Sequence, residues 1–310
     1  MKYYFAPLEG ITNYIFRKIH SIYFPGLDKY FAPFISPNQS KKVMTKEMRD
    51  LLPENNEGIY LVPQILTASG GDFVATARKL SSLGYEEVNL NLGCPSGTVV
   101  AKNKGSGLLA FPEAVERLLD EIFSRLDMKI SVKTRLGMTE GDEFYRLLEI
   151  YNQYPMEELI IHPRVREDFY KNNPRTEYFE YAVLESKNPL CYNGNLYTKE
   201  DIEKLRKRFP DVERLMCGRG LLTDPGFIWQ IQNGGSEVQV CQRIMDFHNT
   251  LYQAYREYMS GERNVLFKMK EIWFYMISYF PGNEKAMKKI KKAQRLADYE
   301  AAVREVFSFK

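Results

Sequence analysis

Apolar residues recur along the chain in eight short runs that are rich in β-branched and aromatic side chains, and a segment with helical spacing follows each run. This alternation predicts eight strand–helix units, the number that closes an α/β fold of the (β/α)8 or TIM-barrel type. The alternative is an open, doubly wound sheet, which is disfavoured because no G-x-G-x-x-G follows the first strand. The predicted strands are residues 3–8, 27–33, 59–66, 86–92, 129–135, 158–163, 190–194 and 214–218.

The pattern changes after Ser236, where strand candidates end and only helical spacing remains. Ser236 is a predicted helix cap and Gly261 a predicted helix end. A second helix extends to about Phe280, and a third starts near Asn283 and continues at helical spacing as far as Phe307. We therefore predict two domains, a barrel of residues 1–236 and an all-helical domain of residues 237–310.

Helix-boundary signals inside the barrel are also present. Asp72 and Pro112 are predicted helix starts, and Gly84 is a predicted stop. Thr198 is a predicted cap for the helix that follows it. Asp201 stands where the capping box usually has Glu or Gln, so an incomplete box is expected there.

Hydropathy and cysteine usage narrow the class of protein. No apolar run approaches the roughly 18 residues of a membrane span, and the N-terminal MKYYFAPLEG has no signal-peptide pattern. We expect a cytoplasmic protein without membrane association. The four cysteines form no C-x-x-C pair, so neither a metal site nor a redox pair is expected. Three of the four are expected to be small buried hydrophobic residues.

Charge is distributed unevenly along the chain. Residues 238–310 contain 13 Lys and Arg against 8 Asp and Glu, whereas residues 1–237 contain 30 against 32. A basic tail on a nearly neutral body indicates a polyanionic partner. Lys285, Lys288, Lys289 and Lys292 share one helix face by their spacing. Such a face suits phosphate contacts, although a solvated surface is the alternative.

Polar residues and glycines follow almost every predicted strand, in the order APLEG, PQI, NLGCPSG, VKTRLG, IHPR, YNGN and CGRG. In a TIM barrel these strand ends meet on one rim, where active sites lie. The glycine turns YNGN and CGRG follow strands seven and eight, the usual phosphate site, and Arg219 can bind a phosphate in a forked geometry. Two ordinary tight turns are the alternative.

Three other polar side chains lie in otherwise apolar strands. Lys133 is costly to bury unless an anion meets it, and the negative edge of a reduced flavin or a neighbouring carboxylate would both serve. Gln64 can give a donor and an acceptor to a ring edge, or be a satisfied core amide. His162 becomes a candidate contact for phosphate or substrate because Arg164 and Arg166 follow it.

The segments APLEGITNYIFR, NLNLGCPS, VKTRLG, IHPR, NGN and CGRG occur in an order and spacing that resemble the dihydrouridine synthases. That family consists of FMN-dependent enzymes that reduce uridines in tRNA. The likeness covers the whole barrel, and the basic helical tail resembles the tRNA-binding domain of the family. The chain departs from the common pattern at Pro163, where glycine is frequent, and at Asn195, where an acidic residue is frequent.

The resemblance implies a role for each matching residue. Cys94 is the implied catalytic proton donor, and Asn91, Arg135 and Arg164 are the implied contacts with uridine and RNA. The tail would add RNA contacts through Lys285, Lys288, Lys289 and Lys292. The implied FMN-binding residues are Pro7, Leu8, Glu9, Gln64, Lys133, His162, Asn193, Gly194, Asn195, Gly218 and Arg219.

The chemistry of uracil reduction explains why a thiol would stand between Gly93 and Pro95. A hydride on C6 must be matched by a proton on C5 from a group within hydrogen-bonding reach. A thiol with a pKa of ~8.5 is mostly protonated at neutral pH and can be that acid. The expected reductant is NADPH or NADH, the expected partner is tRNA, and the protein is expected to act as a monomer. The alternatives are an FMN-dependent reductase of a small enone or pyrimidine, and an RNA-binding protein without catalysis.

Overall fold

The structure is a computed structural model in which residues 1–37 and 46–308 are described. All eight predicted strands are present, and the third is divided into two short pieces at Pro63, which has no backbone N–H to donate to a neighbouring strand. The strands are β1 (Lys2–Phe5), β2 (Lys29–Phe31), β3 (Leu61–Val62), β4 (Gln64–Ile65), β5 (Glu87–Leu92), β6 (Lys129–Arg135), β7 (Leu159–His162), β8 (Leu190–Tyr192) and β9 (Arg214–Cys217).

The strands form one parallel sheet in the order β3-β2-β1-β9-β8-β7-β6-β5-β4. Its two end strands, β3 and β4, are the halves of the divided strand, so the sheet curls until its ends meet at Pro63. The backbone N–H of Asn89 on β5 donates to the Pro63 carbonyl at 2.9 Å, and Ile35 bridges to Ile65. The predicted TIM barrel is therefore confirmed, and the open-sheet alternative is excluded.

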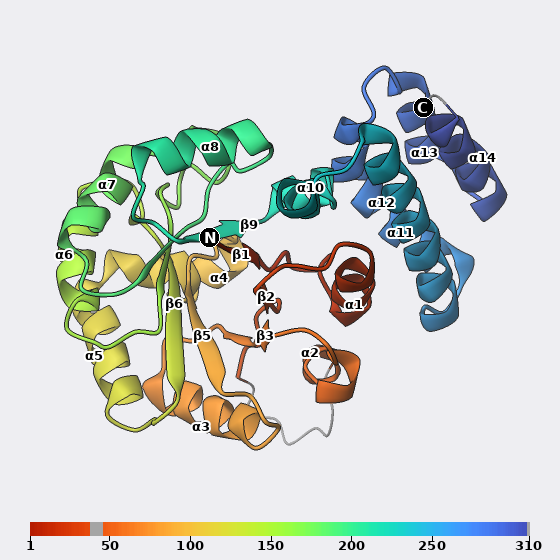
Figure 1. Ribbon diagram of the computed structural model, residues 1–310. Helices are drawn as coiled ribbons and strands as arrows, with labels where there is room; N and C mark the ends of the chain where they lie inside the picture. Colours follow the sequence, from red (N-terminus) through yellow and green to blue (C-terminus); the bar gives the residue numbers. More distant parts are fainter. Residues whose placement is uncertain (38–45, 309–310) are drawn as a thin grey trace.

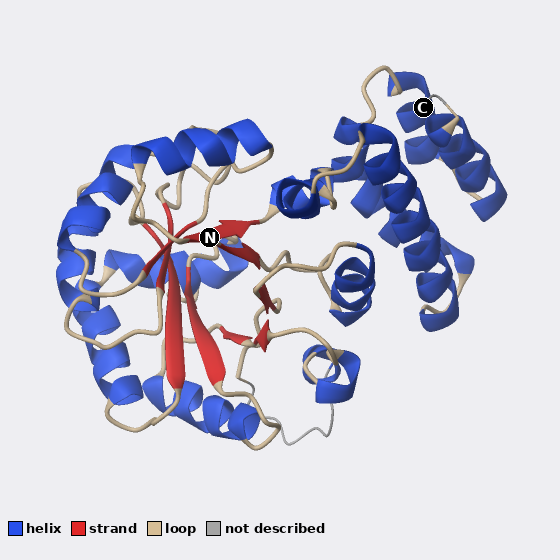
Figure 2. Cartoon of the chain, in the orientation of Figure 1, coloured by secondary structure: helices blue, strands red, loops and turns tan. Residues whose placement is uncertain are grey.

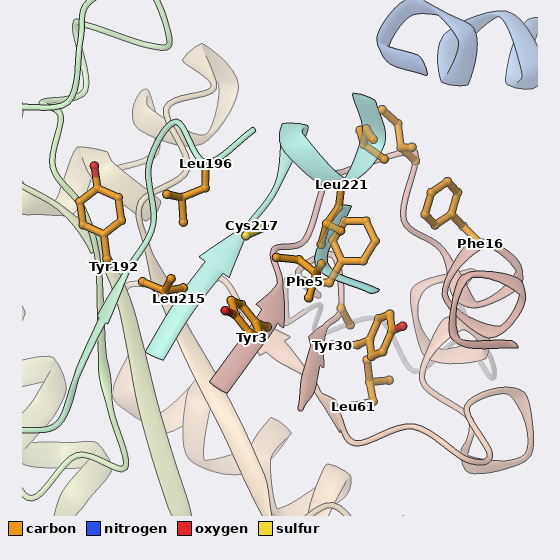
Figure 3. Close-up of a cluster of buried hydrophobic side chains, with 14 of the residues drawn as sticks. Tyr3, Phe5, Phe16, Tyr30, Leu61, Tyr192, Leu196, Leu215, Cys217 and Leu221 are labelled. Carbon is orange, nitrogen blue, oxygen red and sulfur yellow. The ribbon is translucent and has the colours of Figure 1, made fainter. Parts of the chain in front are cut away.

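Side chains alternate between the two faces of each strand, as the pleat requires. Tyr4 on β1 and Ala6, the residue that follows the strand, belong to a cluster inside the barrel, while Tyr3 and Phe5 face the surrounding helices. Figure 3 shows part of this outer core, to which Phe5 on β1 and Leu221 after β9 both belong. The interior cluster consists of Tyr4, Ala6, Phe31, Val62, Ile160, Cys191 and Met216.

Helices surround the strands on the outside of the barrel (Figures 1 and 2). One of them, α3, begins at Gly70, two residues before Asp72, because Ser69 is its cap and accepts the Asp72 N–H. Pro112 begins its helix as predicted. Gly84 follows the end of α3 with a φ of +95°, in the left-handed region that favours glycine. The helices are α1 (Tyr14–Tyr23), α2 (Lys46–Asp50), α3 (Gly70–Ser81), α4 (Gly97–Val100), α5 (Pro112–Phe123), α6 (Glu143–Tyr151), α7 (Thr176–Glu185), α8 (Lys199–Arg208), α9 (Arg219–Thr223) and α10 (Phe227–Asn233), with 3-10 turns at Pro53–Asn55 and Gly105–Ala110.

The expectation of an incomplete capping box at Thr198 was wrong. The Thr198 hydroxyl accepts the backbone N–H of Asp201, and the Asp201 carboxylate accepts the N–H of Thr198 in return. The shorter carboxylate still reaches the cap because the helix start brings the two residues within 3.1 Å. Ser236 caps the first helix of the tail as predicted, and it forms a complete box with Gln239, which was not predicted.

The tail contains four helices, α11 (Glu237–Tyr258), α12 (Glu262–Met276), α13 (Glu284–Lys292) and α14 (Leu296–Phe307), with a 3-10 turn at Ile277–Tyr279. The single third helix predicted from apolar spacing was wrong, because Ala293 has an extended ψ of 132° and the chain turns there into α14. Gly261 does not end α11; it precedes α12 with a φ of +81°.

The tail packs against the barrel through α11, which contacts α1, and α12, which contacts α9. A continuous cluster of buried apolar side chains joins the two parts. Helices α13 and α14 lie at the end of the tail away from the barrel (Figure 1). The division into domains at residue 236 stays a prediction. Within the described ranges, no helix is both long and apolar enough to cross a membrane.

Candidate active site

A hollow opens at the carboxyl ends of β1 and β6 to β9, the rim where the polar strand ends were predicted to meet. Nine of the eleven predicted cofactor-binding residues line it, and no acidic side chain is among the lining residues. A positively charged hollow of this kind suits an anionic ligand. The lining residues are Ala6, Pro7, Leu8, Lys133, His162, Tyr170, Asn193, Gly194, Asn195, Leu196, Tyr197, Met216, Gly218, Arg219 and Gly220.

Lys133 extends into this hollow from β6. None of the residues the structure describes forms an ion pair or a hydrogen bond with its ammonium group, so the carboxylate partner considered from the sequence is absent in this part of the chain. Burial, reinforced by the charge of Arg135, lowers the pKa of Lys133 to about 7. Burying an ammonium group without a carboxylate partner costs free energy, so this arrangement fits a site in which the ligand provides the negative charge.

His162 ends β7 and is buried among cations. The Arg164 guanidinium lies 2.8 Å from His162 Nε2 and can only donate, so Nε2 accepts and the neutral ring has its proton on Nδ1. Burial, together with the charges of Arg135, Lys133, Arg164 and Arg219, lowers the pKa of His162 well below its ordinary value. His162 is therefore a neutral donor at physiological pH and not a further cation.

Hydrogen bonds connect the loops after β8 and β9 on the side of the hollow that these two strands form. Asn195 has a left-handed φ of +34°, and its side-chain oxygen accepts hydrogen bonds from Arg164 at 2.9 Å and Arg219 at 3.2 Å. The Asn193 amide donates to the Met216 carbonyl at 2.8 Å. The side-chain oxygen of Asn195 thus holds two guanidinium groups together where an acidic residue is frequent in the resembling family.

Gly220 is required by the close approach of these loops. A Cβ atom at this position would lie 2.0 Å from the carbonyl oxygen of Leu196. Gly218 differs, because a Cβ there would meet Ala6 at an ordinary 3.4 Å. The two glycine turns are therefore adjacent in space, which favours the phosphate-site interpretation over two unrelated turns.

Cys94 stands on the loop after β5, and its side chain is half-buried. The Asn91 side-chain oxygen accepts the backbone N–H groups of Gly93 at 3.0 Å and Cys94 at 2.9 Å. The Cys94 carbonyl accepts the N–H and hydroxyl of Ser106. Gly105 passes so close, with a φ of +56°, that a Cβ there would lie 2.9 Å from that carbonyl. The Cys94 loop is therefore held in place from both sides.

The environment of Cys94 keeps its thiol protonated. Burial raises the pKa of Cys94 above its ordinary value, and Glu9 raises it further, while Arg135 and Lys133 act in the opposite direction. The other three cysteines, Cys191, Cys217 and Cys241, are buried in apolar surroundings, as predicted. A partly exposed, protonated thiol at the end of a barrel strand matches the demand on a proton donor.

Gln64 and Glu9 do not line the hollow. The Gln64 amide donates to Asn89 at 2.8 Å and accepts from Asn91 at 2.7 Å, the contacts of a satisfied core amide. Glu9 instead lines a separate hollow between the β1 loop and helices α11 and α12, which also includes Tyr14 and Tyr258. Contact of either residue with a cofactor stays a prediction.

The predicted RNA contacts near the site are mostly occupied by protein partners. Asn91 uses both ends of its amide as described above. Arg135 is buried and donates to the carbonyls of Gly93, Val165 and Phe169. Arg164 is likewise buried and donates to the Asn172 carbonyl in addition to its partners in the hollow. These interactions make the three residues determinants of loop shape, and their contact with RNA stays a prediction.

On the tail, Lys285, Lys288, Lys289 and Lys292 lie on the exposed side of α13, as their spacing predicts. The cations are not equivalent, because Lys289 forms an ion pair with Glu305 of α14 at 2.5 Å. The spacing of the lysines gives no information about this partner on α14. The sequence predicted one continuous helix here, so a contact between α13 and α14 could not be foreseen. The role of these lysines in RNA binding stays a prediction.

Sequence reasoning missed the aromatic side chains of the rim. Tyr170 and Tyr197 line the hollow, and the Arg219 guanidinium lies 4.5 Å from the Tyr170 ring centroid. The signal available in the sequence was the aromatic pair FY soon after IHPR. Aromatic residues make up 14% of the chain, so such a pair gives no indication of a site by itself.

Comparison with known proteins gives a family match over nearly the whole chain. A sequence model of the family described as "Dihydrouridine synthase (Dus)" matches residues 4–308. The chain is 26% identical over 223 residues to tRNA-dihydrouridine synthase B of Pasteurella multocida, which is 72% of this chain and 66% of that protein. It is 23% identical over 307 residues to a probable tRNA-dihydrouridine synthase of Staphylococcus aureus, which is 97% of this chain and 91% of that protein.

The chain is also 27% identical to a probable tRNA-dihydrouridine synthase 1 of Synechocystis, and the match covers 63% of that protein. The chain therefore spans less than two thirds of the length of the Synechocystis protein and of the Pasteurella protein. Among solved structures, the old yellow enzyme from Trypanosoma cruzi is similar with a TM-score of 0.53 at 7% identity, over 76% of this chain and 89% of that one. Histamine dehydrogenase from Rhizobium has a TM-score of 0.59 at 11% identity, over 80% of this chain and 46% of that one. At such identities the likeness shows the barrel fold alone.

Proposed function

We propose, from the premise that the chain belongs to the dihydrouridine synthase family, that it reduces the C5–C6 bond of uridines in tRNA to give 5,6-dihydrouridine. The observation that supports this most directly is the half-buried Cys94 thiol at the end of β5, on the same barrel rim as a hollow with cations and glycine turns but no carboxylate among its lining residues. The names of the relatives point to the same reaction.

The residues of the hollow fit FMN as the cofactor. Lys133, with no anionic partner among the described residues, would meet the polar edge of the flavin ring. Pro7 and Leu8 provide an apolar wall. Arg219 and the backbone of the adjacent glycine turns would hold the phosphate, because guanidinium and N–H groups are its usual ligands. When bound and reduced by NADPH or NADH, FMN supplies the hydride that C6 of uracil receives.

The chain's own residues supply the proton. The S–H bond of Cys94 breaks as the C5–H bond forms, which leaves a thiolate that solvent reprotonates before the next turnover. Proton transfer requires a protonated thiol within hydrogen-bonding reach of C5. The raised pKa of Cys94 supports the first condition, and the loop held by Asn91 and Ser106 supports the second by fixing the thiol in place.

The RNA must present an unstacked uridine to this site, because a base stacked inside an RNA helix cannot enter the hollow at the rim of the barrel. The lysines of α13 would bind tRNA phosphates at the far end of the tail, so that the RNA extends from there to the barrel. No feature of the described residues calls for a protein partner, and we propose that the protein acts as a monomer.

Supplying the purified protein with FMN, NADPH and an acceptor tests this function. Unmodified tRNA transcripts should stimulate NADPH oxidation and accumulate dihydrouridine, measured by mass spectrometry of the digested RNA. Small enones and free pyrimidines should do neither at comparable concentrations. NADPH oxidation with a small enone but not with tRNA would support the small-molecule reductase instead.

A further inference from the structure

The loop after β7 places a bulky residue in an unfavourable backbone conformation. Phe169 has a φ of +48°, the left-handed region that costs a residue with a Cβ free energy and that glycine or asparagine usually occupies. Phe169 is 39% exposed, so burial of the ring does not offset this cost. Strain of this kind persists where the surroundings enforce it, and it often marks a functional segment.

Several buried groups enforce this conformation. Arg135 Nη1 donates to the Phe169 carbonyl at 3.0 Å, and Arg135 Nε donates to the Gly93 carbonyl at 2.9 Å. One guanidinium therefore joins the backbone of Phe169 to the residue that precedes Cys94. The buried carboxylate of Asp168 holds the same turn, because it accepts the Val165 N–H at 3.1 Å and the Asn172 amide.

The two aromatic residues of this loop have different surroundings. Tyr170 lines the hollow, with its ring near the guanidinium groups of Arg135 and Arg219. Phe169 is not among the residues that line the hollow and is exposed at the rim. The Arg166 guanidinium lies 5.0 Å from the centroid of the Phe169 ring, and its buried Nε has no hydrogen-bond partner among the described residues. An exposed ring backed by a cation is thus tied to the Cys94 loop through Arg135.

We propose that Phe169 stacks on an unpaired base of the RNA next to the uridine that enters the site. This inference rests on the proposed function, since turning a uridine out of its stack leaves neighbouring base faces uncovered. Aromatic side chains are the usual partners of such faces, and they accept any base because every base has a π face. The buried arginine Arg135 acts as a positioning residue for this contact, and Arg166 supports the ring from the protein side.

Three substitutions at this position separate stacking from structure. Phe169→Asn removes the ring but suits a left-handed backbone, Phe169→Tyr keeps an aromatic face, and Phe169→Leu keeps only apolar character. The probes are unmodified tRNA transcripts and a uridine-containing single-stranded oligonucleotide, with dissociation constants measured over a range of salt concentrations. We expect Phe169→Asn to weaken binding about tenfold, the size of one base–aromatic stack. Phe169→Tyr should match the wild type, and Phe169→Leu should fall between them.

Three further readouts distinguish a stacking contact from a structural one. The slope of affinity against salt should be the same in all four proteins, because the stack involves no phosphate. FMN content and the midpoint of thermal unfolding should not fall in Phe169→Asn. Equal RNA affinity in Phe169→Asn and the wild type, or full affinity in Phe169→Leu, would overturn the inference. If the wild type binds RNA but forms no dihydrouridine, the proposed function fails while the ranking of the variants still decides the stacking contact.

Discussion

The side-chain oxygen of Asn91 accepts the backbone N–H of Cys94 at 2.9 Å, and the same atom accepts the N–H of Gly93. The side-chain nitrogen of Asn91 donates to Gln64 at 2.7 Å. This hydrogen bond fixes the Asn91 side chain against the interior of the barrel. The thiol is therefore positioned by a residue of β5 that need not touch the substrate. A nearly buried amide with three partners leaves them unsatisfied when it is removed.

Replacing Asn91 with alanine should accordingly displace the thiol and destabilise the protein. Leaving these partly buried donors and the buried acceptor on Gln64 unpaired costs roughly 1–3 kcal/mol in the free energy of unfolding. We expect kcat for uridine reduction to fall by more than the KM for tRNA rises, because the loop and not the RNA surface is altered. Denaturant unfolding and steady-state kinetics measure the two effects. An unchanged kcat in a correctly folded Asn91→Ala protein would show that Asn91 does not position the thiol.

The barrel, its eight strands and the strand-end site could be predicted from the sequence because apolar alternation and glycine turns are local signals. Lys133 is an example of a site residue that such local signals identify, because a lysine inside an apolar strand already indicates an anionic partner. The split of the third strand at Pro63 and the break at Ala293 were not predicted. The split at Pro63 depends on how the barrel closes, and the break at Ala293 depends on how α14 packs. The local spacing of apolar residues therefore predicts neither.

The detailed partners of the site residues were also beyond the sequence. Gln64 had two nearly equal interpretations, and only the positions of Asn89 and Asn91 across β4 and β5 show it to be a satisfied amide. Arg135 was expected to face RNA, yet its guanidinium is enclosed by three carbonyls. Both outcomes depend on interactions between segments far apart in the chain, which periodicity does not encode.

FMN affinity should depend on pH through Lys133. Because burial and Arg135 lower the pKa of this lysine to about 7 in the protein without ligand, the positive charge disappears as pH rises through 7. The electron-rich carbonyl edge of the flavin ring favours the protonated form, so affinity should be highest below pH 7 and decline above it, by up to about tenfold per pH unit. Titration of the flavin-free protein with FMN between about pH 6 and 9 measures this.

The matched control for that titration is Lys133→Met, which keeps most of the length of the side chain without its charge. Its FMN affinity should be lower than that of the wild type in mildly acidic buffer and should lack the decline that is due to Lys133, whereas any titration of the FMN phosphate itself remains in both proteins. Parallel pH profiles in the wild type and Lys133→Met would contradict a role for this lysine in holding the carbonyl edge of the flavin ring.

The lysines of α13 should contribute unequally to tRNA binding. Lys289 already forms an ion pair with Glu305, whereas Lys288 and Lys292 form no ion pair with any residue the structure describes. Replacing Lys288 or Lys292 with glutamine should therefore reduce the slope of log affinity against log salt by about one for each phosphate that is no longer neutralised. Replacing Lys289 should have a smaller effect.

Glu305→Gln provides the converse variant for this surface. Without its carboxylate partner, Lys289 is available to bind phosphate, so tRNA affinity should rise and its salt dependence should steepen. FMN content should stay constant in all of these variants, because α13 lies away from the barrel (Figure 1). Salt slopes that match the wild type in the Lys288 and Lys292 variants would exclude this face as the RNA-binding surface.

Single-turnover reduction of tRNA by Cys94→Ala tests most directly whether the sulfur of residue 94 gives C5 of uracil its proton. The variant is loaded with FMN, reduced with NADPH and mixed with unmodified tRNA, and dihydrouridine is then counted by mass spectrometry. We predict normal FMN content and normal reduction by NADPH, with product formation slower by about 100-fold or more, as expected when a general acid is removed. Dihydrouridine formed at the wild-type rate would contradict the account.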